Sequence, residues 1–121
     1  MQKLSILIPA YNEANTIHLI LDRIKEVELI GSYGKEIIVV DDCSSDGTVD
    51  EVQKYMESNK ELDIQLFRQE RNRGKGAAIH KAISLASGDY LIVQDADSEY
   101  DPSEYNKLLR PVIDGFADVV Y

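Results

Sequence analysis

The sequence is poor in cysteine, in basic residues and in long apolar runs. Cys43 is the only cysteine, so no internal disulfide can form, the fold does not depend on an oxidising compartment, and we expect a cytoplasmic protein. Apolar runs such as residues 37–40 are far shorter than the roughly 18 residues of a membrane helix, and the N-terminus lacks the apolar core of a signal peptide. We therefore expect no membrane span within this chain.

The shortage of basic residues excludes a further class of partner. The 121 residues include 13 Lys and Arg against 22 Asp and Glu, which gives a formal net charge of -9. Proteins that bind nucleic acid usually present a basic face to the phosphates, so we expect no nucleic-acid partner. An acidic protein can still hold a phosphate compound if a divalent cation lies between the two, which directs attention to clustered carboxylates.

Short apolar runs alternate along the chain with segments of helical periodicity. Hydrophobic residues make up 44% and charged residues 29%, as in globular proteins, and no linker or repeat divides residues 1–121 into two domains. The pattern predicts strands at 3–8, 36–40, 64–67, 90–93 and 118–121, and helices at 17–27, 49–56, 77–86 and 105–113. Repeated strand-helix units favour a mostly parallel sheet with helices on both faces, so we predict one α/β domain of Rossmann-like fold.

Ligands of such sheets bind beyond the carboxyl ends of the strands. After the first strand, Pro9 makes a rigid turn from which Tyr11 and Glu13 can reach a nucleoside, with the ring against the base and the acid on the ribose. Alternatively, Pro9 ends the strand, Tyr11 packs in the core, and Asn12 or Glu13 helps the next helix to begin. The segment by itself leaves both interpretations open.

The segment after the second strand, residues 41–48, carries three carboxylates together with hydroxyl side chains. Like charges this close favour either a cation or hydrogen-bond donors between them. Asp42, at the strand end, is well placed to accept a hydrogen bond from a base amide or a ribose hydroxyl. Ser45 and Asp46 are also typical of helix caps and turns.

Two further segments bring charge toward the same edge of the sheet. Residues 71–76 precede a helix, so Lys75 and the helix N-terminus can face a diphosphate, although the spacing is not that of a Walker A loop and a solvated basic loop is the alternative. Directly after the fourth strand, Asp95 and Asp97 form a D-x-D segment, and residues two apart in an extended segment point the same way. Both carboxylates can therefore address one Mg²⁺ or Mn²⁺. Such a triplet is common in polar loops, and its alignment with the other acidic strand ends is what favours a metal site.

Five segments taken in order resemble the successive motifs of family 2 glycosyltransferases with the GT-A fold: SILIPAYNE, VVDDCSSDGT, NRGKGAA, ASGDY and QDADSEYDP. The stretch 94–121 is similar to polyprenyl-phosphate sugar synthases, the dolichol-phosphate-mannose-synthase-like branch. Two positions depart from the family pattern, since Cys43 stands where Gly is frequent and Ser98 where Leu is frequent.

The resemblance implies roles for the matching positions. It places nucleoside contacts on one group of residues, Pro9, Tyr11, Glu13, Val40 and Asp42. It places the ribose, diphosphate and metal contacts on Asp95, Ala96 and Asp97, with Asp97 as the direct metal ligand.

The reaction implied by the resemblance is transfer of a sugar, with inversion, from a UDP- or GDP-linked donor to an acceptor such as a polyprenyl phosphate or a glycan. The metal would stabilise the leaving diphosphate. A polyprenyl phosphate is already an anionic nucleophile, whereas a hydroxyl acceptor needs a general base, and no residue of the chain is a convincing base. Family members continue past residue 121 with the acceptor region. We therefore expect a chain truncated at its C-terminus and inactive alone, whose full-length form works at the cytoplasmic face of a membrane.

Two other classes of protein fit part of the pattern. A response-regulator receiver phosphorylated on aspartate also combines an α/β sheet with an acidic pair and a later strand-end aspartate. A receiver, however, needs two more strand-helix units after that aspartate, and only 26 residues (121 - 95) follow Asp95. A domain that binds nucleotide and catalyses nothing is the third interpretation.

Overall fold

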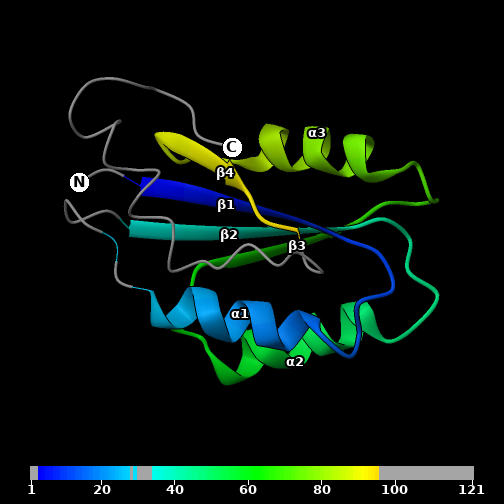
Figure 1. The fold of residues 1–121 in the computed structure, drawn as a ribbon, viewed down its shortest axis with the longest axis horizontal. Helices are drawn as coiled ribbons and strands as arrows, with labels where there is room; N and C mark the ends of the chain where they lie inside the picture. The colour runs from blue at the N-terminus through cyan, green and yellow to red at the C-terminus, as the bar shows by residue number, and fades with distance from the viewer. Residues whose placement is uncertain (1–2, 28, 30–33, 96–121) are drawn as a thin grey trace.

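A four-stranded parallel sheet forms the middle layer of the fold (Figure 1). The computed structural model describes residues 3–27, 29 and 34–95. β1 (Lys3–Ala10) lies between β2 (Gly34–Asp41) and β4 (Tyr90–Val93), and β3 (Ile64–Arg68) pairs with the other side of β2. The chain thus builds the sheet outward from β1 through β2 to β3, then crosses back to place β4 on the opposite side of β1.

The helices cover both faces of this sheet (Figure 1). α1 (Ile17–Glu26) and α2 (Thr48–Ser58) lie on one face, and α3 (Lys75–Leu85), which connects β3 to β4, lies on the other. The predicted α/β fold is confirmed, as are the four strands and three helices predicted within the described residues. The helix predicted at 105–113 and the strand predicted at 118–121 lie outside the described residues. Within the described part of the chain, no helix combines the length and apolarity that crossing a bilayer requires.

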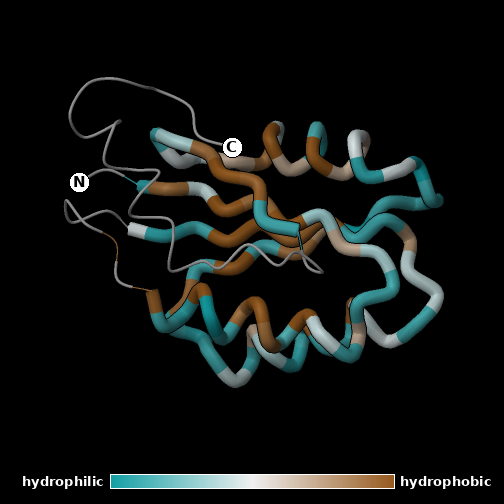
Figure 2. Tube along the Cα trace, in the orientation of Figure 1, coloured by the Kyte–Doolittle hydropathy of each residue, from teal (hydrophilic) through white to brown (hydrophobic). Residues whose placement is uncertain are grey.

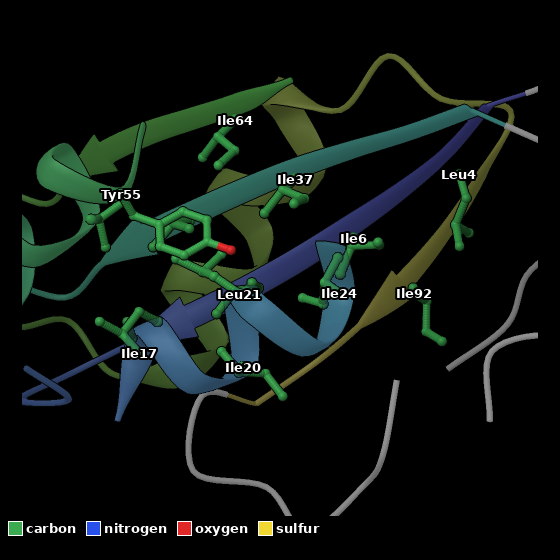
Figure 3. Packing of buried hydrophobic residues seen from close by; sticks show 14 residues of the cluster. Leu4, Ile6, Ile17, Ile20, Leu21, Ile24, Ile37, Tyr55, Ile64 and Ile92 are labelled. Carbon is green, nitrogen blue, oxygen red and sulfur yellow. The ribbon is translucent and has the colours of Figure 1, made fainter. Parts of the chain in front are cut away.

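Side chains of the strands alternate between the two faces, and each face has its own core. In β1, Leu4, Ile6 and Ile8 belong to the core under α1 and α2, whereas Leu7 belongs to the core under α3. Figure 2 shows the apolar residues concentrated on the strands, with polar residues in the loops. Figure 3 shows the larger core, to which the helices contribute branched and aromatic side chains: Ile17, Ile20, Leu21, Ile24, Val52 and Tyr55.

The core under α3 is smaller. Ala78 and Ala82 lie one turn apart and are fully buried against Leu7, Ile38 and Val40. Small side chains on a helix let it lie close to the larger side chains of the facing strands. The first turn of α3 is therefore held near the carboxyl ends of β1 and β2.

Pro9 lies inside β1 and does not end it, contrary to one of the two interpretations of that segment. It pairs with Val40 of β2. In a parallel strand the N–H and C=O of a residue point to the same side, and the carbonyl of Leu7 accepts a hydrogen bond from Gln94 on the β4 side. Pro9, two residues on, has the same orientation as Leu7 and lies past the described β1–β4 pairing, which ends at Val93. Its missing N–H therefore costs no hydrogen bond to β2.

A buried carboxylate joins the amino ends of the strands. Glu36 is 1% exposed and accepts hydrogen bonds from the Ser5 hydroxyl at 2.9 Å, the Ser87 N–H at 2.9 Å, the Ser87 hydroxyl and Lys3 Nζ at 3.3 Å. Burial alone would raise the pKa of Glu36, but the hydrogen bonds from Ser87, Ser5 and Lys3 outweigh it and lower that pKa from 4.5 to about 2. Position 88, next to Ser87, has no room for a side chain. A Cβ at Gly88 would lie 2.9 Å from the Lys3 carbonyl oxygen and closer still to the Ser5 hydroxyl.

Replacing Glu36 by Gln should lower the free energy of unfolding at pH 7 by about 2 kcal/mol, because the amide keeps the shape and loses the charge-assisted hydrogen bonds. A carboxylate whose pKa is lowered on folding stabilises the protein above its unfolded pKa, and this contribution is lost as the pH falls. The difference between parent and Glu36→Gln should therefore shrink between pH 4.5 and about 2. Urea unfolding across this range measures it.

The matched control is Glu57→Gln, since Glu57 is exposed on α2. It should leave stability within about 0.5 kcal/mol of the parent. If the difference in free energy of unfolding between the parent and Glu36→Gln stays constant from pH 7 to pH 2, Glu36 is not a carboxylate that stabilises the fold through its charge.

Candidate functional site

A pocket of about 350 Å³ opens where the carboxyl ends of the strands meet the loops that follow them. Its walls come from the end of β1 and the loop after it, the residue after β2, the loop before α3 with the first turn of α3, and the residue after β4. The lining residues are Pro9, Ala10, Tyr11, Glu13, Asp42, Asn72, Gly74, Lys75, Ala78 and Asp95. The pocket thus lies between β1 and β4, where the strand order reverses.

Most of the site residues predicted from the sequence line this pocket: Pro9, Tyr11, Glu13, Asp42, Lys75 and Asp95. Val40 does not line it, because its side chain is fully buried in the core under α3. Ala96 and Asp97 lie outside the described residues. The nucleoside and metal contacts assigned to all of these positions stay predictions, whereas the convergence of the six lining residues on one pocket is a property of the structure.

Hydrogen-bond donors surround the three carboxylates at the end of β2 and just after it. Asp41 is fully buried and accepts from the Ser44 N–H at 2.8 Å and the Ser44 hydroxyl at 2.5 Å. Asp46 accepts from the hydroxyl and N–H of Thr48 and from the Ala14 N–H at 3.2 Å, and the Thr48 hydroxyl in particular lowers the pKa of Asp46. Hydrogen-bond donors, one of the two possibilities left open by the sequence, thus lie between these charges. No group of three His, Cys, Asp or Glu residues suited to a metal ion occurs among the described residues.

The third carboxylate, Asp42, fastens the basic loop before α3. It is 4% exposed, and its two oxygens accept from the N–H groups of Arg73 and Gly74, each at 2.8 Å. Gly74 has φ 95°, a conformation that favours glycine, so the chain can turn both N–H groups toward one carboxylate. Each oxygen of Asp42 keeps a further lone pair that can accept from a ligand in the pocket.

The loop after β1 is fastened to the same segment through Ser44 and Thr48, to which the sequence alone assigned no role. The Asn12 N–H donates to the Ser44 hydroxyl at 2.8 Å, and the Glu13 N–H donates to the Thr48 hydroxyl at 2.9 Å. Asn12 has φ 53°, which asparagine tolerates well, and its side-chain oxygen accepts from the Ser45 N–H at 2.9 Å. The loop therefore holds Tyr11, with 46% of its surface exposed, at the pocket.

A cation and an anion face each other across the pocket. Nζ of Lys75, in the first turn of α3, lies 2.5 Å from a carboxylate oxygen of Asp95, which follows β4 by two residues. Both side chains are partly exposed, so solvent and a ligand can reach the pair. Oxygen from a carboxylate suits Mg²⁺ or Mn²⁺, and an ammonium group suits a phosphate oxygen.

Cys43 occupies a strained backbone position beside this site. Its φ is 60°, in the left-handed region, where a side chain other than that of Gly, Asn or Asp is disfavoured. This conformation accounts for the frequency of Gly at this position in the family pattern, since Gly adopts it most easily, and Cys43 adopts it under strain.

Cys43→Gly should be more stable than Cys43→Ala by about 1 kcal/mol, because both remove the thiol and only the first relieves the left-handed conformation. Cys43→Val should be the least stable of the three, since a β-branched side chain is the most strained there. Urea denaturation of the three variants gives the order. Equal stability of the Gly and Ala variants would show that φ at this position relaxes without cost.

The strand order assigns the chain to the doubly wound α/β proteins whose ligands bind where the order reverses, which is where the pocket lies. A receiver has its first strand between the second and third, whereas here β2 separates β1 from β3, so the receiver interpretation has no support. Residues 5–121 match Glycosyl transferase family 2, and the chain belongs to this family.

Individual relatives agree with this assignment. The chain is 36% identical over 112 residues to a dolichyl-phosphate beta-glucosyltransferase of Dictyostelium discoideum, covering 87% of this chain and 34% of that protein. It is 31% identical over 113 residues to a dolichol-phosphate mannosyltransferase of Pyrococcus furiosus, covering 93% of this chain and 31% of that protein. The chain thus spans about a third of the length of these relatives.

A solved structure shares the fold. The mannosyltransferase PcManGT from Pyrobaculum calidifontis, in complex with GDP-Man and Mn²⁺, superposes with a TM-score of 0.75 at 31% identity, covering 85% of this chain and 30% of that chain. The predicted GT-A fold and the resemblance to polyprenyl-phosphate sugar transferases are confirmed.

Proposed function

We propose that residues 1–121 form the donor-binding portion of a glycosyltransferase that transfers a sugar, with inversion, from a nucleoside diphosphate sugar to an acceptor. The observation that carries this proposal is the Lys75–Asp95 pair at the point where the strand order reverses. A diphosphate bridged to the protein by a divalent cation needs one cationic and one anionic side chain side by side, and this pair supplies both.

The other pocket residues suit the nucleoside. Tyr11 offers an exposed ring on which a base can stack, and Glu13 and Asp42 offer carboxylate oxygens to a base amide or a ribose hydroxyl. The Lys75 ammonium and the first turn of α3 address the diphosphate. Pro9 forms part of the wall. Val40 is fully buried and does not line the pocket, so any contact that it makes with a nucleoside would have to come from its backbone.

Asp95 is the described residue best suited to a metal, and we propose Asp97 as its companion and Ala96 as a donor contact. The Mn²⁺ in the Pyrobaculum mannosyltransferase complex supports a divalent cation, and the oxygen ligands suit Mg²⁺ as well. A bound cation would stabilise the charge that develops on the leaving diphosphate. With a cation on Asp95, the Lys75 ammonium would be free to donate to a phosphate oxygen.

The acceptor that we propose is a polyprenyl phosphate. Two relatives are named for dolichyl or dolichol phosphate, which supports this class of acceptor over a glycan. A phosphate oxygen attacks the anomeric carbon without first losing a proton, so the pocket needs no general base. Work at the cytoplasmic face of a membrane fits such an acceptor and is part of the same proposal.

The proposal is tested by Asp95→Asn. GDP or UDP with Mn²⁺ at a hundredfold excess over the dissociation constant should stabilise the parent by about 2.7 kcal/mol, and the variant should lose most of the Mn²⁺-dependent part. Stability without ligand should change by less than about 1 kcal/mol, because the Lys75–Asp95 pair is partly exposed. Melting curves with and without nucleotide and Mn²⁺ provide the measurement.

Asp63→Asn, which alters an exposed aspartate just before β3, is the matched control and should keep the full shift. If Asp95→Asn keeps the full Mn²⁺-dependent shift, or if neither nucleotide stabilises the parent, the pocket is not the donor site.

Tyr11→Ala should weaken binding of nucleoside and nucleotide alike, each by about tenfold, because it removes a stacking surface and leaves the phosphate contacts in place. Calorimetric titration with uridine, guanosine and their diphosphates measures both losses. Leu19→Ala removes a comparably exposed apolar side chain from α1 and should change neither affinity. A loss confined to the diphosphates would assign Tyr11 to the phosphate contacts instead.

A further inference from the structure

A second hollow, of about 650 Å³, lies between the end of β3 and α3. It is lined by Phe67, Gln69, Glu70, Arg71, Arg73 and Lys81 and shares none of these residues with the pocket described above. Its size falls within the range of small-molecule sites in proteins, roughly 300 to 1,000 Å³.

The hollow carries a local excess of positive charge on an acidic protein. Residues 68–81 contain five of the 13 basic residues of the chain and a single acid, Glu70, although the net charge is -9. Two of the five already have partners, since Arg68 donates to the Ser44 carbonyl oxygen and Lys75 pairs with Asp95. Among the described residues, no carboxylate forms an ion pair with the remaining three, Arg71, Arg73 and Lys81. All three line the hollow.

Two of these cationic residues are anchored. Nζ of Lys81 lies 4.3 Å from the centroid of the Phe67 ring, which places the ammonium over a wall of the hollow. The backbone N–H of Arg73 is held by Asp42 at 2.8 Å. A site whose cationic residues are anchored before binding loses less conformational entropy when a ligand arrives.

Gln69 also lines the hollow. The residue is 8% exposed, and its side-chain amide can donate a hydrogen bond to a ligand oxygen as well as accept one.

We infer that this hollow binds a phosphate monoester. Two guanidinium groups and an ammonium group supply only donors, the amide of Gln69 can donate as well, and Glu70 is the one acid on the walls. This set suits an oxyanion with two charges and three free oxygens. A singly charged carboxylate would leave most of these donors unused. The volume exceeds that of a phosphate group, so it admits the organic part of the ester, either as a free metabolite or as a lipid headgroup.

The test uses the full chain in EDTA, so that no metal supports binding in the other pocket. Inorganic phosphate and glycerol 3-phosphate are titrated by calorimetry against the parent and against Arg71→Gln combined with Lys81→Gln. The paired substitution should weaken binding at least tenfold. Binding of GDP or UDP with Mn²⁺ should change less than twofold, so failure of this inference and failure of the proposed function are separate results.

The matched control combines Arg23→Gln with Lys60→Gln, which removes the same charge from exposed positions on α1 and just after α2. This control should weaken phosphate binding less than twofold. If both double variants lose the same phosphate affinity, the inference is overturned, because the phosphate would then be attracted by the overall charge and not by the hollow.

Vesicles of phosphatidylcholine with and without phosphatidic acid, whose headgroup is a phosphate monoester, distinguish the source of the ligand. Binding of both free esters and vesicles, or of free esters alone, assigns the hollow to a soluble ester. Retention on phosphatidic acid vesicles alone, lost in Arg71→Gln with Lys81→Gln, assigns it to a lipid headgroup. If neither the free compounds nor the vesicles bind the parent, the hollow is not a phosphate site.

Discussion

The carboxyl end of the sheet depends on three neighbouring carboxylates whose mutual repulsion has to be offset by hydrogen-bond donors. Asp41, Asp42 and Asp46 lie within six residues, and each takes its donors from a different part of the chain: Asp41 from its own turn, Asp42 from the loop before α3, and Asp46 from the loop after β1 as well as from Thr48. Repulsion between the like charges is offset by these hydrogen bonds. Each carboxylate has its donors only when the segment that supplies them is in place, so the carboxylates hold these segments together. The two loops that form the pocket walls are ordered by this one segment.

The same segment relates the two hollows to each other. Asp42 lines the pocket at the carboxyl ends of the strands, while Arg73, whose N–H donates to Asp42, lines the hollow beside α3. A ligand in the hollow that moves Arg73 would therefore alter the hydrogen bond between Arg73 and Asp42, which holds the loop that carries Gly74 and Lys75. The backbone of the basic loop is fixed by Asp42, and the residues of the loop line both hollows.

The elements of the fold were predictable because burial imposes a simple periodicity on them. The alternation in β1 and the spacing of Ile17, Ile20, Leu21 and Ile24 identify their faces without a structure. Pocket residues could be predicted where chemistry and position coincide, as for Asp42 and Lys75 at the ends of their elements. The attachments through Asn12, Ser44 and Thr48 could not, because a hydroxyl that accepts from a distant backbone N–H leaves no periodic signal in the sequence. The resemblance assigned Val40 a nucleoside contact, but its side chain points into the core under α3. Position along the strand alone did not indicate this.

The unequal cores on the two faces of the sheet have a consequence for how the molecule opens. α1 buries four branched side chains, whereas α3 buries two alanines. Burial of each methylene contributes about 0.8 kcal/mol, so α3 is the layer that detaches at the lower free energy while the opposite core stays intact. Its amides should form a separate exchange unit, less protected than those of β1. Lys75 is the first residue of α3. A ligand that contacts both Lys75 and the end of β4 would therefore hold the least stable layer against the sheet, and its binding would slow amide exchange in α3.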